Sequence, residues 1–468
     1  MSSRLSPIGL FGSRRDLLGG LTTIGLCAMV IGFDLLGDRS ASMTLALVIF
    51  TLSALLLAWI PPTLAATLFL LGAVIANLAP ASVVFSGFHS SAVWLVMGSM
   101  LISAALVRSG IDQKIARLFD ALPTATYAQT LFTTMLIGLA LLVVVPSAFS
   151  RVVLIIPLAA AFAERQGLVH GSRGFNGVVV IAVCSTYLTS FSILTTGYPN
   201  LVITGIVENL FAVQISFGHW FAMNFLVFGL MRLGLIFLVV YMLFPAQLPK
   251  NRDLNMNQLP QQPFTAEQKK VSLIAVLAIV LWATDFWHGI AAGWIGLAAG
   301  IACYARPVTG ESSGKFVEAL EVGPLLLIAG LMSIGAVIAH TGAVDFIVPM
   351  LSRVIPMSSE FGIFYALAWM NVLVQFITTN AALPSVMLPI SEAIMATTDQ
   401  SLNTVLAAHI AGYSNLPVPH LAGPTIYAMY SAGIMKQRFV MAVIWVALGM
   451  AIMLWPIYFF WLKWIGFL

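Results

Sequence analysis

The chain alternates long apolar runs with short polar turns, and one such turn lies where an apolar run is expected to sit in a membrane. Thr378-Thr379-Asn380-Ala381 separates two apolar stretches, and Pro389 follows within the second. In lipid, a backbone that turns must find internal hydrogen-bond partners or line a water-filled cavity. We therefore expect this turn to be the tip of a re-entrant helical hairpin and part of a binding site.

The same pattern occurs earlier in the chain. The turn from Ser147 to Arg151 lies between the apolar runs Tyr127–Val145 and Val152–Ala163. A constant offset carries this turn and Pro157 onto the later turn and its proline. The second run, about 12 residues or about 18 Å of helix, is too short to cross a membrane alone. A re-entrant hairpin is therefore expected in each half.

A second interruption follows each hairpin. Thr195–Asn200 interrupts the run that begins at Phe175, and Pro417, Pro419 and Gly423–Thr425 interrupt the run that begins at Leu402. Proline lacks an amide donor and glycine permits unusual dihedral angles. Broken helices are expected at both places.

The order of elements divides the chain into two similar halves joined by a polar linker. The expected segments are first-half helices (1–123), a first-half hairpin, broken helix and closing helix (124–244), a cytoplasmic linker (245–270), second-half helices (271–356) and the second-half hairpin, broken helix and closing helix (357–468). Within the first segment, Ala41–Ile60 and Thr63–Ala79 are predicted to be helices separated at Pro61-Pro62. Ile111–Leu122 is predicted to be an amphipathic helix in the interface.

Composition places these elements in a membrane. Of the 468 residues, 60% are hydrophobic and 8% are charged, which is too apolar for a soluble domain. At about 20 residues per crossing, the apolar length predicts about eleven spans. The expected fold class is an all-α polytopic membrane protein.

The three cysteines are isolated in apolar runs, so neither a disulfide framework nor a zinc site is expected. The basic residues form no stripe, which argues against a nucleic-acid partner.

Charge placement predicts the orientation. Most of the 21 Lys and Arg residues fall on the N-terminal side of the predicted spans, and Arg4, Arg14 and Arg15 precede the first, Leu17–Leu36. The positive-inside rule then places the N-terminus in the cytoplasm. An odd number of spans separates equivalent points of the two halves, so the halves are expected to be inverted repeats.

The second hairpin tip offers oxygen ligands for a cation. Sodium binds hydroxyl, amide and carbonyl oxygens, which Thr378, Thr379 and Asn380 supply together with the backbone near Gly423 and Pro424. Threonine and asparagine are also good helix caps, so capping of the helical arms is the alternative. Repetition of the geometry in both halves favours a binding site.

Arg151 is the most informative residue of the first tip. An arginine at membrane depth costs several kcal/mol unless it is paired or hydrated, so it normally faces a cavity. We expect it either to bind a carboxylate or sulfonate or to replace a sodium ion, aided by the positive N-terminal end of its helix. The alternatives are a pair with Glu164 or Asp399, or a snorkelling side chain at a shallow hairpin.

Two more residues near these turns have chemistry of interest. His420 precedes the second break, and because the pKa of histidine lies near physiological pH it is a candidate proton carrier; a structural histidine is the alternative. Phe149 either stacks on an apolar part of a substrate or plugs the first tip.

These residues resemble the divalent anion/sodium symporter family, whose members carry Ser-Asn-Thr at two hairpin tips and a Gly-Thr-Pro-Pro-Asn-like break after each hairpin. Thr379-Asn380-Ala381 is similar to the second tip, Thr196-Gly197-Tyr198-Pro199-Asn200 to the first break, and the run from Glu208 to Phe221 to the segment after it. The first tip departs from the family pattern at Ala148, Phe149 and Arg151, and the second break keeps only Thr425.

The resemblance implies a homodimeric elevator-type transporter in a bacterial inner membrane. Segments 1–123 and 271–356 would be its scaffold helices, and segments 124–244 and 357–468 its transport elements. Its partners would be lipid, a small anion and a sodium ion or proton, with no cofactor. The implied substrate-binding residues are Ser147, Phe149, Ser150, Arg151, Thr379, Asn380, Ala381 and Thr425. The implied cation-binding residues are Ser147, Thr196, Gly197, Thr378, Thr379, Asn380, Gly423 and Pro424. The second-half cation site is favoured, because the first tip lacks the family's asparagine.

The predicted function is secondary active transport of a di- or tricarboxylate, sulfate or sulfonate, coupled to a cation. The alternative is a sodium-independent exchanger or a proton-coupled carrier in which Arg151 replaces a sodium ion. An intramembrane enzyme is disfavoured, because the sequence has no His-Glu-x-x-His motif and no base paired with Ser147 or Ser150. A channel fits poorly, since inverted hairpins and broken helices are typical of alternating access.

Overall fold

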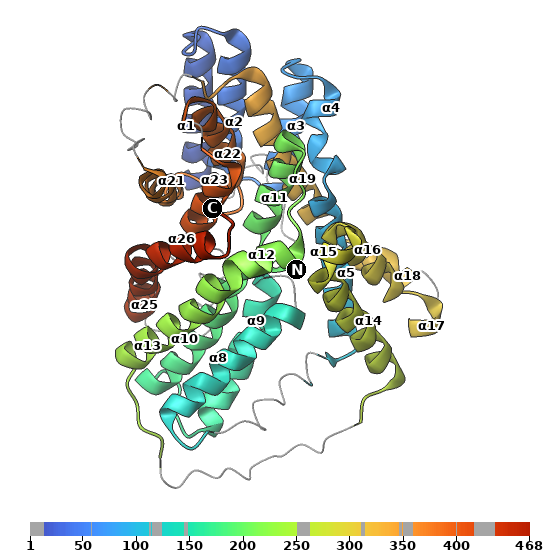
Figure 1. Ribbon diagram of the computed structural model, residues 1–468, viewed down its shortest axis with the longest axis vertical. Coiled ribbons are helices and arrows are strands. Elements are labelled where there is room, and N and C mark those ends of the chain that lie inside the picture. Colours follow the sequence, from blue (N-terminus) through green and yellow to red (C-terminus); the bar gives the residue numbers. More distant parts are fainter. Residues whose placement is uncertain are drawn as a thin grey trace. The chain divides into compact units, whose positions relative to one another are not determined.

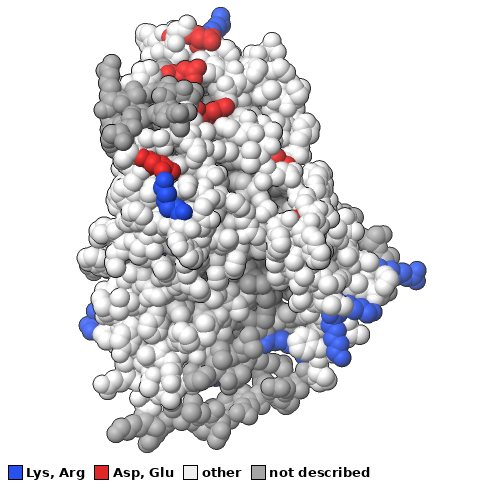
Figure 2. Space-filling model, viewed as in Figure 1, with Lys and Arg blue, Asp and Glu red and all other residues white. Residues whose placement is uncertain are grey.

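The computed structural model describes residues 14–57, 59–111, 114, 124–144, 148–249, 263–309, 314–345, 349, 359–398, 400–415 and 436–468. These residues form helices and turns, with no β-strand among them. Within them, six helices are long and apolar enough to cross a membrane, and further apolar helices are shorter. Figure 2 shows few charged side chains on the face in view, as expected for helices surrounded by lipid. The all-α membrane fold is confirmed, whereas eleven spans and inverted repeats remain predictions.

The chain divides into two compact units, each made of three stretches of sequence. The first unit comprises residues 1–93, 201–214 and 322–413, and the second comprises 94–200, 215–321 and 414–468. The division into scaffold and transport segments concerns movement during transport, so it remains a prediction.

In the first unit, the central helix is α19. The helices of this unit are α1 (Arg14–Gly32), α2 (Arg39–Leu57), α3 (Pro62–Ile75), α4 (Ala81–Val84), η1 (Ser86–His89), most of α11 (Tyr198–Phe211), α19 (Val322–Thr341), α21 (Glu360–Val374), α22 (Leu383–Thr398) and α23 (Leu402–Tyr413) (Figure 1). Helix α19 packs against α2, α3, α4 and α22, and its residues 328–338 are all buried. A helix that is apolar on every side can be buried on every side, which explains this position.

In the second unit, the central helix is α10. The helices are most of α5 (Ser91–Arg108), α8 (Tyr127–Val144), α9 (Ala148–Arg165), α10 (Arg173–Tyr187), η2 (Leu188–Ser192), η3 (Leu194–Thr196), α12 (Phe217–Asn224), η4 (Phe225–Met231), α13 (Arg232–Leu243), α14 (Ala266–Ala283), α15 (Asp285–His288), α16 (Ala292–Ala302), α17 (Arg306–Thr309), α18 (Gly314–Ala319), α25 (Lys436–Gly449), η6 (Met450–Leu454) and α26 (Trp455–Trp464). Helices α8, α9 and α13 pack against α10, as Figure 1 shows, and residues 174–187 of α10 are all buried.

Local sequence signals set several helix boundaries. Pro62 begins α3, at a position where the missing amide donor costs nothing, so the predicted separation of α2 from α3 is confirmed. Thr265 and Gln268 form a capping box that begins α14.

Helices α5 and α16 approach so closely that a Cβ at Gly98 would lie 2.2 Å from the carbonyl carbon of Gly296. Of the predicted interfacial helix Ile111–Leu122, only Ile111 and Lys114 lie among the described residues.

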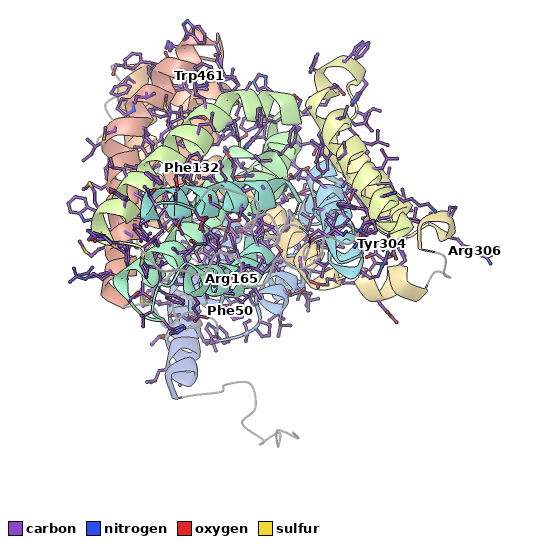
Figure 3. All side chains as sticks on the ribbon, turned by 90° about the horizontal axis from the view of Figure 1, so that it is seen from below. Phe50, Phe132, Arg165, Tyr304, Arg306 and Trp461 are labelled. Atoms are coloured by element: carbon purple, nitrogen blue, oxygen red, sulfur yellow. The ribbon has the colours of Figure 1, made fainter. Side chains whose placement is uncertain are left out.

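Charged and aromatic side chains of the second unit meet at helix ends. Arg108, at the end of α5, pairs with Glu267 at 3.2 Å, and its guanidinium carbon lies 4.6 Å from the centre of the Tyr304 ring. Figure 3 shows Tyr304 close to the helices and Arg306 projecting away from them. Basic and aromatic side chains of this kind are typical of the membrane interface.

Both predicted hairpins are present as pairs of helices, α8 with α9 and α21 with α22. The second arm of the first hairpin was expected to span only Val152–Ala163. Helix α9 instead has 18 residues, because it includes tip residues from Ala148 and a polar last turn that ends at Arg165. The expected length was wrong, so arm length no longer argues for a re-entrant hairpin, which remains a prediction.

The closing helix of each half contains a π-helical turn. The helices Phe217–Leu243 and Arg438–Trp464 have 27 residues each. The π-helical turns are η4 in the first and η6 in the second. A π turn shifts the register of the side chains that follow it and occurs frequently at functional sites. This shared irregularity agrees with the predicted repeat.

Candidate functional site

The first break, predicted at Thr195–Asn200, begins earlier in the structure, because α10 ends at Tyr187 and short helical segments follow it. After α10 come the 3-10 segments η2 and η3, and α11 begins at Tyr198. Both 3-10 segments are buried, and so are the hydroxyls of Thr189, Ser190 and Ser192. Because 3-10 turns have poorer hydrogen-bond geometry than an α-helix, the carbonyls here need other donors.

Thr196 and Asn200 supply several of these donors. The Thr196 hydroxyl lies 2.6 Å from the carbonyl oxygen of Ser190 and 2.9 Å from that of Ile193. Asn200 Nδ2 donates to the same two carbonyls at 3.1 and 2.9 Å. The Thr196 side chain, predicted as a cation ligand, therefore also holds the break together.

Arg151 reaches this break from the first hairpin. It lies in the first turn of α9, is 0% exposed, and donates from Nη2 to the carbonyl oxygen of Thr196 at 3.0 Å. Complete burial excludes the snorkelling alternative. Of the two predicted acidic partners, Glu164 contacts His170 at 3.1 Å, and Asp399 lies outside the described residues. A guanidinium therefore occupies a place where a broken helix presents a carbonyl to a positive charge.

A second buried arginine, Arg232, bonds the other end of the same break. It is 1% exposed and donates from Nη1 to the carbonyl oxygen of Leu188. Its Nη2 donates to the Ser414 hydroxyl at 3.0 Å, and its Nε lies 3.1 Å from the sulfur of Met450. Among the described residues, no carboxylate lies within salt-bridge distance of Arg232. Sequence reasoning gave it no role, although an arginine inside an apolar run is a signal of function.

The tip of the second hairpin, between α21 and α22, contains buried oxygens without partners. Thr378 is 0% exposed and Asn380 is 6% exposed. Thr378 Oγ1, Asn380 Oδ1, Gln375 Oε1 and Ser385 Oγ have no hydrogen-bond partner in the part of the chain that the structure describes. Buried polar atoms are nearly always hydrogen-bonded, so four unpartnered oxygens within eleven residues of the sequence, 375–385, are candidate ligands of a bound ion.

The geometry of this tip favours ligand binding over capping. The carbonyl of Thr379 accepts from the amides of Ala382 and Leu383, both at 3.1 Å. The backbone therefore starts α22, and the side chains of Thr378 and Asn380 make no capping bond. Hard cations prefer oxygen ligands of this kind. Within the described ranges, no cluster of His, Cys, Asp and Glu could hold a metal ion.

Part of the predicted site cannot be placed. The positions Ser147, His420, Gly423, Pro424 and Thr425 lie outside the described residues, as do the side chains of Phe149 and Ser150. Gly197 follows η3 in an extended conformation, and Ala381 is partly exposed at the second tip. The structure brings Arg151 to Thr196 and groups Thr378 with Asn380.

Sequence reasoning missed three further residues of the second half. Gln375 and Ser385 flank the predicted tip and add two of its four unpartnered oxygens. His409 is fully buried on α23 and bonds both helices of the hairpin. Each is a polar residue close to the end of an apolar run, which was the available signal.

Comparison with known proteins relates the chain to membrane transporters. A family model described as the sodium:sulfate symporter transmembrane region matches residues 22–468. A membrane protein of Cupriavidus necator is 24% identical over 343 residues, 70% of this chain and 66% of that protein. The L-tartrate/succinate antiporter of Shigella dysenteriae serotype 1 is 25% identical over 211 residues, 42% of each protein. The chain thus spans less than two thirds of the length of these relatives.

A solved structure shares the fold. The Alcanivorax borkumensis YdaH transporter matches with a TM-score of 0.58 and 17% identity, over 82% of this chain and 87% of that one. Identity this low supports the fold alone, whereas the family model covers nearly the whole chain. The Shigella protein and the Alcanivorax protein are named as transporters, and neither is named as an enzyme. Because the model of the sodium:sulfate symporter transmembrane region matches nearly the whole chain, this integral membrane protein belongs to the divalent anion/sodium symporter family.

Proposed function

We propose that this protein is a secondary active transporter of a small anion of the dicarboxylate, tricarboxylate, sulfate or sulfonate class, coupled to a cation. It works by alternating access, in which the hairpins and broken helices move as an elevator within a homodimer in the bacterial inner membrane. The observation that carries the proposal is the group of unpartnered oxygens at the second tip, which includes those of Thr378 and Asn380.

The second tip carries oxygen atoms of the kinds that bind sodium. Two hydroxyls and two amide oxygens are buried there without a hydrogen-bond partner among the described residues. Leaving such atoms unsatisfied costs about 1–3 kcal/mol each, and a bound cation removes that cost. The ion would be held by Gln375, Thr378, Asn380 and Ser385 and would compensate the charge of the anion.

The first half has a positive charge of its own. Arg151 donates to the Thr196 carbonyl at 3.0 Å, at the N-terminal end of α9 where the helix dipole adds positive potential. We therefore expect one exchangeable cation, in the second half, with Arg151 in place of another in the first. An arginine at this position also suits a carboxylate, sulfate or sulfonate group.

A sodium-independent exchanger is the second candidate. Two observations favour it: the Arg151–Thr196 contact provides a fixed charge, and relatives matched over part of the chain are named as L-tartrate/succinate antiporters. A proton-coupled carrier is a variant of this candidate, and its predicted carrier, His420, lies outside the described residues.

Thermal unfolding of the purified protein against anions, in sodium and in choline, separates the two candidates. Dicarboxylates, tricarboxylates, sulfate and sulfonates are tested in turn. Stabilisation by one anion only in sodium supports the symporter, and stabilisation that is equal in choline supports the exchanger. No response to any anion would refute both. Counterflow of the stabilising anion, labelled, in proteoliposomes then distinguishes a carrier from a channel.

A further inference from the structure

His409 lies between the two arms of the second hairpin. It is 0% exposed on α23. Its Nδ1 lies 2.9 Å from Asn371 Oδ1 on α21, and its Nε2 lies 2.9 Å from Ser391 Oγ on α22. One imidazole therefore joins three helices, and two of these form the hairpin that carries the unpartnered oxygens.

The hydrogen bonds define the protonation of this ring. Asn371 Nδ2 donates to the carbonyl oxygen of Leu367 at 2.8 Å, which leaves Oδ1 as the atom that faces His409. An amide oxygen only accepts, so Nδ1 of His409 carries the proton. Nε2 is then free to accept from the Ser391 hydroxyl. The network specifies a neutral imidazole in the Nδ1–H form.

The two arms are tied to α23 unequally. Helix α21 is bonded to α23 at two other levels: Thr404 Oγ1 donates to Glu360 Oε1 at 2.9 Å, and Gln375 Nε2 donates to the Gly412 carbonyl at 3.0 Å. It also packs tightly, since a Cβ at Gly412 would lie 2.4 Å from the Cβ of Asn371. Between the described residues of α22 and α23, the side-chain hydrogen bond is that of Ser391, and α22 also packs on α19, α21 and α23. Among the described residues, His409 is thus the side chain that hydrogen-bonds both the second arm and the well-anchored first arm.

We propose that His409 is a positioning residue of the second-half cation site: as a neutral ring it fixes the spacing of the hairpin arms and so keeps the tip oxygens in place. The inference rests on the proposed cation site at this tip. It assigns His409 no transfer of a proton.

The surroundings of His409 agree with a neutral ring. The titratable side chains on the helices packed around it are Glu360 and Tyr365 on α21, Glu392 on α22, His340 on α19 and Tyr413 on α23. Among the described residues, none of these bonds His409, whose partners are Asn371 and Ser391. A charged imidazolium would therefore lie in the membrane without a counter-charge, which is costly.

Two substitutions separate the two bonds. His409→Asn places a donor near Nδ1 and loses the bond to Ser391, whereas His409→Gln places an acceptor near Nε2 and loses the bond to Asn371. We expect His409→Asn to speed hydrogen–deuterium exchange in residues 383–398 about fivefold, as one lost hydrogen bond implies. His409→Gln is expected to have a smaller effect, confined to residues 360–374, because α21 keeps its other bonds.

Thr404→Val is the matched control. It breaks a partly buried polar bond between α23 and α21, at the end of α21 away from the tip, and leaves the bond between α23 and α22 in place. Sodium affinity, measured by thermal stabilisation, is expected to fall about fivefold in His409→Asn and to stay unchanged in Thr404→Val. Equal losses in the two variants, or unchanged exchange in both His409 variants, would overturn the proposal. No sodium response in the wild type would refute the cation site, while the exchange data still decide the role of His409.

Asn371→Asp gives a readout that a purely structural role would not change. A carboxylate beside Nδ1 favours the charged imidazolium over the neutral ring. Once Nε2 gains a proton, it can no longer accept from Ser391. Sodium affinity is expected to weaken with falling pH in this variant more than in the wild type. Identical pH profiles would contradict the assigned hydrogen-bond pattern.

Discussion

The two hairpin tips have equivalent places in the sequence but opposite arrangements of polar atoms. At the first, Arg151 donates to the carbonyl of Thr196, whose hydroxyl is itself bonded within the break. At the second, the oxygens of Thr378 and Asn380 are buried without partners among the described residues. The positive charge at the first tip is part of the chain, whereas at the second tip we propose that it comes from a bound cation.

The difference between a fixed and a bound positive charge affects how transport depends on an ion gradient. A charge that belongs to the chain is present at every ion concentration, so it contributes nothing that depends on an ion gradient. A bound ion stabilises its state by an amount that grows with its concentration. An asymmetric pair of tips therefore suits a carrier that couples to fewer ions than a symmetric one.

The largest expected effect comes from Arg151→Gln, which removes the charge but keeps an amide. Transport at low sodium is expected to fall at least about tenfold, since a hydrogen bond to a charged group contributes about 1.5–3 kcal/mol. The remaining transport should depend more steeply on sodium, because the first half then lacks its charge. Initial uptake rates in proteoliposomes at several sodium concentrations measure both changes.

Arg165→Gln is the control for this variant, because Arg165 is exposed at the other end of the same helix. It is expected to transport like the wild type. Wild-type transport by Arg151→Gln as well would remove the basis of the comparison between the tips.

The next effect is expected from Thr378→Val, which replaces an unpartnered hydroxyl by a methyl group of similar size. Thermal stabilisation by sodium should be lost. In choline the variant should be as stable as the wild type or more stable by up to about 1 kcal/mol, because an unsatisfied buried group is removed. A variant that loses stability equally in both salts would show that the hydroxyl serves the fold.

Thr196→Val makes the same change in the first half and should have the opposite signature. The carbonyls of Ser190 and Ile193 lose a donor, so the free energy of unfolding should fall by about 1 kcal/mol. The stabilisation by sodium should remain. Thermal unfolding of the two threonine variants side by side measures the asymmetry directly, and matching behaviour would argue against it.

The smallest effect is expected from Ser385→Ala. Its hydroxyl is one of four unpartnered oxygens at the second tip, so its loss should weaken apparent sodium affinity about threefold. Sodium titrations followed by thermal unfolding give this value. An effect as large as that of Thr378→Val would mean that Ser385 is a principal ligand.

The sequence predicted the helices better than the contacts. The separation of α2 from α3 at Pro61-Pro62 and the break after α10 follow from local chemistry, and both are confirmed. The predicted length of α9 was wrong, because a charged residue within an apolar run indicates a turn when its partner is unknown. Arg151 instead lies in the helix and donates to the Thr196 carbonyl in the break. The tip at Thr378 was located from its neighbours in the chain, but Gln375 and Ser385 were missed because each lies in an apolar run.

The sequence by itself determined the membrane environment, the helices and the places where they break. These depend on apolar length and on residues that deprive the local backbone of hydrogen bonds, which lipid cannot replace. Only the tertiary structure decided which polar atoms find partners. Arg151 meets a carbonyl 45 residues away, and Arg232 meets a hydroxyl 182 residues away. Whether a buried oxygen is satisfied depends on neighbours that folding brings together, so the open oxygens of the second tip are a property of the fold.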